Sequence, residues 1–152
     1  MIKKNFIKLI MLLIFVSGCG YSPIFSNKNS NFSIQELNTI GNFKLNKIVN
    51  NKLNNNNNPD SPKKFSLKVE TYLKKEITSK DPKGNPKTYR INLKFNVLVT
   101  DLNGNKKKKS FSKSIDYNNR DNKSELKKYE NETAKNLAEK ISDQIIIYLS
   151  SI

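Results

Sequence analysis

The chain has 152 residues, a formal charge of +15 and 36% hydrophobic residues. This length suits one domain with one core, the charge favours anionic partners, and a single cysteine excludes a disulfide within the chain. The absence of histidine excludes a histidine base, a histidine metal ligand and a Ser-His-Asp triad.

Residues 1–18 have the parts of an export signal that ends at the only cysteine, Cys19. Three lysines supply positive charge, and an apolar run that is too short to span a bilayer follows before small Gly18. We expect cleavage between Gly18 and Cys19, with a diacylglycerol and an N-acyl group carried on Cys19. The alternative is an ordinary secretory signal with a chance cysteine.

Residues 19–31 mix Gly, Ser, Pro and Asn with few apolar residues, which predicts a lipidated tether before a single domain at residues 32–152. Alternation around Phe32 and Ile34 predicts a short strand. Apolar residues at spacings of three and four over residues 40–53 predict an amphipathic helix, with Asn42 as its N-cap.

An Asn-rich loop is predicted at residues 54–62, where five asparagines precede Pro59 and Pro62. This segment has nothing to bury and cannot continue a helix, so we expect a solvated or disordered loop.

Three strands are predicted from period-two alternation over residues 65–73, 89–99 and 111–117. The second alternation is the clearest in the chain and predicts a central strand. Pro and Gly at residues 79–86 predict the first turn. Asn103 and Gly104 predict a tight two-residue hairpin, in which both residues would need a positive φ.

The last element is a helix predicted over residues 123–150, where Asn122 and Glu125 have capping-box spacing. The order strand, helix, three strands, helix predicts an α+β fold, with two helices packed on one face of a roughly four-stranded, mostly antiparallel sheet. The apolar stripe of this last helix is predicted to comprise Leu126, Tyr129, Thr133, Leu137, Ile141, Ile145, Tyr148 and Leu149, with small Ala134 and Ala138 beside it.

Catalytic chemistry is missing from the sequence. Acids are sparse and scattered, and no Gly-rich phosphate loop is present. Ser and Lys do recur three residues apart, but such matches are expected by chance in a lysine-rich chain. We therefore predict a protein that is not an enzyme, with no metal site and no cofactor other than the acyl groups on Cys19.

The run Cys-Gly-Tyr-Ser-Pro-Ile-Phe at residues 19–25 resembles the start of the mature LptE family, and the element order is also similar. The resemblance implies an outer-membrane lipoprotein that faces the periplasm and sits inside the β-barrel LptD. There it would act as plug and assembly factor and help to deliver lipopolysaccharide. Gly20, after the lipidated residue, is compatible with outer-membrane sorting. The alternative for this run is a generic lipoprotein tether.

A basic tip is predicted where four consecutive lysines follow the second hairpin turn, and Arg90 lies on the polar face of the neighbouring strand. Ammonium groups at such a tip suit the phosphates of an anionic saccharide lipid. The alternatives are a solvated strand edge and a biased base composition that over-uses lysine. The candidate lipopolysaccharide-binding residues are Arg90, Lys106, Lys107, Lys108 and Lys109.

Two functions of different classes remain open from the sequence. The first is a lipopolysaccharide-transport subunit that works with an LptD-like barrel. The second is a free-standing envelope lipoprotein with a structural or maintenance role. Nucleic acid is not an expected partner, because the exported chain leaves the compartment of DNA and RNA and its aromatic residues occupy predicted core positions.

Overall fold

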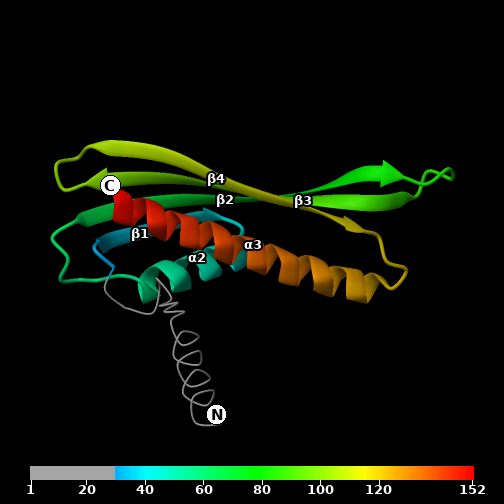
Figure 1. Cartoon of the computed structure of the whole chain (residues 1–152), viewed down its shortest axis with the longest axis horizontal. Coiled ribbons are helices and arrows are strands. Elements are labelled where there is room, and N and C mark those ends of the chain that lie inside the picture. The colour runs from blue at the N-terminus through cyan, green and yellow to red at the C-terminus, as the bar shows by residue number, and fades with distance from the viewer. Residues whose placement is uncertain (1–29) are drawn as a thin grey trace, which may run out of the picture.

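The computed structural model describes residues 30–152, so the predicted signal peptide and Cys19 lie outside the described residues. Two helices cover one face of a four-stranded sheet (Figure 1). The predicted α+β fold is confirmed. The elements in chain order are β1 (Ser33–Gly41), α2 (Phe43–Asn55), β2 (Lys64–Lys80), β3 (Pro86–Asp101), β4 (Lys106–Asn118) and α3 (Lys123–Ser151).

The sheet has the order β1-β2-β3-β4 and is mixed. β1 is parallel to β2, whereas β2, β3 and β4 are joined by antiparallel pairing. Parallel neighbours need a crossover connection, and α2 supplies it. β1 is longer than predicted and contains Ile40, which the sequence placed in the helix. The predicted cap is confirmed, because Asn42 Oδ1 accepts hydrogen bonds from the backbone N–H groups of Lys44 and Leu45 at 3.1 and 3.2 Å.

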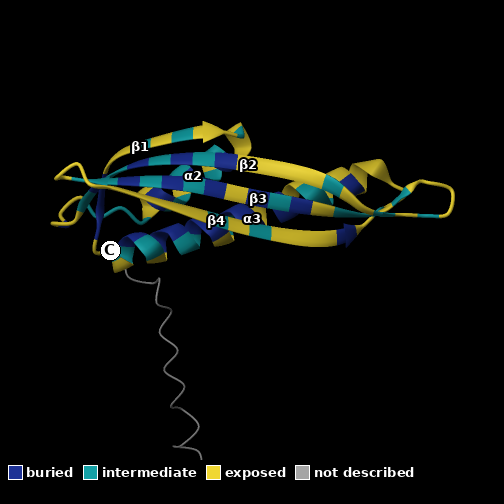
Figure 2. Cartoon of the chain, turned by 90° about the horizontal axis from the view of Figure 1, so that it is seen from above, coloured by how far each residue is buried: buried dark blue, intermediate teal, exposed yellow. Residues whose placement is uncertain are grey.

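The core lies between the helices and the inner face of the sheet, where buried and less buried residues alternate along β2 and β3. Figure 2 shows this buried band and the exposed far part of the β2–β3 hairpin. The stripe of α3 follows the prediction closely. Tyr129 and Tyr148 are only partly buried, however, and Ser142 and Ile146 are buried although the predicted stripe omitted them.

Amide groups of the Asn-rich loop form hydrogen bonds with the chain at the start of β1. This finding corrects the expectation that the loop has nothing to bury. Asn55 still belongs to α2, so the loop begins later than predicted. Asn57 Oδ1 accepts from Ile34 N at 2.7 Å, Asn58 N donates to the Phe32 carbonyl at 3.2 Å, and Ser61 is buried. The loop therefore satisfies backbone groups at the start of β1.

Both hairpin turns have the pattern Asp-x-x-Gly-Asn, at residues 81–85 and 101–105. In each, the Asp carboxylate accepts backbone N–H groups and the Asn side chain, at 2.8–3.1 Å. Only Gly84 and Gly104 have a positive φ there, of 86° and 80°. The predicted two-residue turn at Asn103 is therefore wrong. Four residues, 102–105, connect β3 to β4, and among them only Gly104 has a positive φ.

These two turns predict an acid-sensitive contribution to stability. Hydrogen bonds from Asn85 and Asn105 lower the pKa of Asp81 and Asp101. A carboxyl whose folded pKa is depressed stabilises the fold above its unfolded pKa of about 3.9, and this contribution is lost as the pH falls through the folded value. The denaturation midpoint should therefore fall more between pH 7 and pH 3 in the natural chain than in the double variant Asp81→Asn/Asp101→Asn. An equal fall in both would contradict this assignment.

Candidate functional site

The four predicted lysines begin β4, and the structure divides them between the two faces of the sheet. Lys107 and Lys109 lie opposite buried residues of β3, so they point toward the helix-bearing face. The other two alternate with them and point to the outer face, which no helix covers (Figure 1). The lysine run is defined as Lys106, Lys107, Lys108 and Lys109, all exposed.

A shallow hollow on the outer face forms the first cationic surface, here called the outer patch. Its rim includes Lys68, Lys94 and Lys108. Ser110 Oγ donates to Asn96 Oδ1 at 2.8 Å between the lysine-bearing strands. These polar side chains surround a site that can accept phosphate and saccharide hydroxyl groups.

One acid lies in the outer patch and offsets part of its charge. Glu70 is 3.1 Å from the ammonium of Lys68. Hydrogen bonds from Lys68 and from the hydroxyl of Tyr72 lower the pKa of Glu70, so this carboxylate stays ionised at neutral pH. Within residues 30–152, Lys94 and Lys108 form no ion pair. On the outer face of the hollow, these two lysines are available to an anion, and Lys109 also lines the hollow.

Arg90 is not brought together with the lysine run. It lies opposite Asp116 at the other end of β3, whereas Lys106 lies opposite Thr100. The separation along the strand is roughly 30 Å at about 3.3 Å per residue. The guanidinium of Arg90 donates to both carboxylate oxygens of Asp116, at 2.6 and 2.7 Å. This bidentate pair lowers the pKa of Asp116. It also engages the positive charge of Arg90, which the sequence-based prediction assigned to an external ligand.

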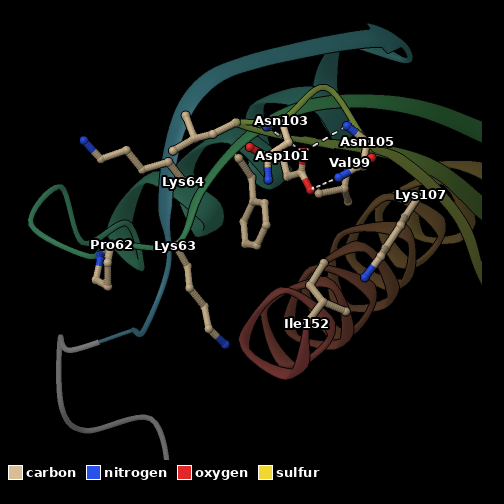
Figure 3. A pocket seen from close by; sticks show the side chains of 11 residues that line it. Pro62, Lys63, Lys64, Val99, Asp101, Asn103, Asn105, Lys107 and Ile152 are labelled. Carbon is tan, nitrogen blue, oxygen red and sulfur yellow. Dashed lines mark hydrogen bonds between the residues drawn. The ribbon is translucent and has the colours of Figure 1, made fainter.

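A second cationic surface, here called the end groove, lies where the turn at residues 101–105 meets the end of α3 (Figure 3). Three lysines surround it: Lys63, Lys64 and Lys107. Its apolar lining includes Phe65 and Leu102, and the Leu102 side chain is 71% exposed. This groove was not predicted from the sequence, because its residues come from three separate segments.

A cluster that holds α3 on the sheet was not predicted from the sequence either. Glu130 Oε1 accepts from Tyr117 Oη at 2.8 Å and lies 2.5 Å from Lys75 Nζ. Tyr117 stacks on Tyr89 and contacts Tyr129, with ring centroids 5.6 and 5.5 Å apart. Burial and the nearby Glu130 raise the pKa of Tyr117. Because all these groups are partnered, the cluster is structural.

No group of three or more metal-ligating acids or cysteines occurs within residues 30–152. In the same part of the chain, neither helix is both long and apolar enough to cross a membrane.

The sequence and the fold both have counterparts among known proteins. The sequence model of the LptE family, described as lipopolysaccharide-assembly, matches residues 28–149. No curated protein matches the chain.

Solved structures of lipoproteins have a similar fold. Rare lipoprotein B from Shewanella oneidensis is 18% identical, with a TM-score of 0.61 over 78% of this chain and 94% of that one. A minor lipoprotein from Acinetobacter baumannii is 14% identical, with a TM-score of 0.59 over 81% and 92%. Lipoprotein B from Nitrosomonas europaea is 13% identical, with a TM-score of 0.58 over 82% and 88%.

Proposed function

This chain belongs to the LptE family of lipopolysaccharide-assembly proteins, and on that premise we propose that it is the lipoprotein subunit that works with an LptD-like β-barrel at the outer membrane. The observation that carries the proposal is the family match over residues 28–149. The family consists of non-enzymatic assembly lipoproteins, so the chain acts in lipopolysaccharide assembly rather than in catalysis.

The anchor in this proposal is Cys19, which is acylated after cleavage of the bond between Gly18 and Cys19. It holds the domain at the outer membrane on the periplasmic side. Mass spectrometry of the protein from envelopes should find a chain that begins at Cys19 and carries a diacylglycerol and an N-acyl group. The Cys19→Ala variant should lack both and leave the membrane fraction. An unmodified amino terminus on the natural chain would contradict the anchor.

The barrel partnership is tested by affinity capture. The tagged mature protein, recovered from detergent-solubilised envelopes, should bring down an LptD-like barrel in near-equal amount. The domain offers a barrel partner an exposed β2–β3 hairpin with the large apolar residues Tyr72, Leu73 and Ile77 at its surface. A chain recovered alone would favour the free-standing envelope lipoprotein.

Lipopolysaccharide binding is assigned to the lysine run, with the outer-face pair Lys106 and Lys108 contributing most. Lys108 lies beside Lys94 in the outer patch. The neighbouring Asn96 and Ser110 present amide and hydroxyl groups to a saccharide. Lipid A phosphates bound there would form charge-assisted contacts that salt weakens. Arg90 is left out because Asp116 already neutralises it.

Two variants of equal charge test this assignment. Lys106→Gln/Lys108→Gln should lower affinity for purified lipopolysaccharide roughly threefold to tenfold and flatten its salt dependence. Lys107→Gln/Lys109→Gln, on the other face, should have a smaller effect. Affinity is measured at low and high salt for both pairs. If changing all four lysines leaves affinity and salt dependence unchanged, the lysine run has no part in binding.

A further inference from the structure

The start of the described chain, the end of α3 and the end groove all lie at one end of the elongated domain, called here the anchor end (Figures 1 and 3). Asn31 Nδ2 donates to the Ser150 carbonyl at 3.0 Å, and Asn58 Nδ2 donates to the Ser30 carbonyl at 3.0 Å. Ser33 N donates to the Lys63 carbonyl at 2.7 Å. The first described residues, Ser30 and Asn31, therefore lie at the same end as the end groove.

We propose that the anchor end docks on the anionic phospholipid head groups of the leaflet that holds the acyl chains, with Lys63, Lys64 and Leu102 as its contacts. This inference rests on the proposed lipidation of Cys19. The segment between Cys19 and Ser30 has a reach of at most about 40 Å, because an extended chain spans no more than about 3.6 Å per residue. Acylated Cys19 would therefore keep the anchor end within about 40 Å of the leaflet.

Charge around the end groove favours this partner. Lys63, Lys64 and Lys107 line it, and none of them has an ion-pair partner within residues 30–152. The acid that lines the groove, Asp101, is engaged by Asn103 and Asn105 in the turn. Each Lys near an anionic leaflet adds favourable electrostatic energy that falls off within a Debye length.

The apolar part of the anchor end distinguishes docking from general attraction of a basic protein. Leu102 is 71% exposed in its turn and lines the same groove as the three lysines. An exposed apolar side chain in a lysine-lined groove suits the boundary between head groups and acyl chains. The equivalent position of the β2–β3 turn is Pro82, and that turn also carries exposed Lys83. The two ends therefore share charge but not the exposed leucine.

The binding test uses the mature chain with Cys19→Ala, so that any vesicle binding comes from the protein surface. Vesicles contain three parts phosphatidylcholine to one part phosphatidylglycerol, or phosphatidylcholine alone. Lys63→Gln/Lys64→Gln should weaken binding to the anionic vesicles roughly tenfold. The matched control, Lys83→Gln/Lys87→Gln, removes the same charge at the opposite end and should change binding less than about twofold. Equal losses in both pairs would overturn the proposal.

A spectroscopic test reports which end meets the lipid. The chain has no tryptophan, so Leu102→Trp and Pro82→Trp each introduce a single probe at equivalent turn positions. Only Leu102→Trp should shift to the blue with anionic vesicles and be quenched by brominated acyl chains. No shift, or equal shifts for both, would overturn docking. Both tryptophan variants are made in the Cys19→Ala chain, which carries no acyl group. A failure here would therefore not bear on the proposed acylation of Cys19, which has its own mass-spectrometric test.

Discussion

Replacing Gly41 with alanine is expected to lower the free energy of unfolding by about 3 kcal/mol or more. Gly41 ends β1 with a φ of +112°, and a Cβ atom there would lie 2.2 Å from the Thr71 carbonyl oxygen. Thr71 cannot move away easily, because it is buried in β2 and its Oγ1 accepts from Asn42 N at 3.0 Å. The substitution therefore disfavours the left-handed backbone conformation of Gly41 and also the close approach of β1 to β2. Urea denaturation measures the loss.

Gly84 and Gly104, the other glycines with a positive φ among residues 30–152, supply the control for this experiment. At Gly84 and Gly104, an added Cβ atom would have no neighbouring atom within 4 Å, so alanine at either should cost only about 1 kcal/mol for the conformation itself. If Gly41→Ala costs no more than Gly104→Ala, the close contact with Thr71 has no energetic weight.

Replacing Phe95 with alanine is expected to destabilise the fold by about 4 kcal/mol. Phe95 is fully buried in β3, which pairs with β2 on one side and with β4 on the other. Removal of its ring loses apolar burial and leaves a cavity between the sheet and the helices. A loss of this size is a large part of the roughly 5–15 kcal/mol that stabilises most domains. The denaturation midpoint in urea or on heating should fall accordingly.

Phe43 is the matched control, because it has the same side chain with opposite exposure. It begins α2 and is 81% exposed. Phe43→Ala should change the free energy of unfolding by no more than about 0.5 kcal/mol. Similar losses at both positions would mean that the core does not lie where the burial pattern places it.

Local patterns were sufficient for most of the secondary structure. Alternation predicted β3 because its alternate side chains enter one core, and Asn42 and Asn122 were recognisable as caps because a cap bonds backbone groups only two or three residues away. The patterns were insufficient where a residue bonds to a distant segment. Asn57 satisfies Ile34 of β1, and nothing beside Asn57 in the sequence indicates that partner.

For the candidate site too, local patterns were sufficient for some features and insufficient for others. The sequence by itself determined the high positive charge and the four lysines after the last hairpin, and its run at residues 19–25 predicted the LptE family, because charge and short motifs are local. Only the tertiary structure decided which lysines share a surface. The register of β4 places Lys106 and Lys107 on opposite faces of the sheet, and Arg90 pairs with Asp116. The end groove, which Lys63 lines, is formed by three segments that are distant in the sequence. Strand register and the packing of the chain ends depend on contacts between residues far apart in the sequence. Local sequence patterns do not reveal such contacts.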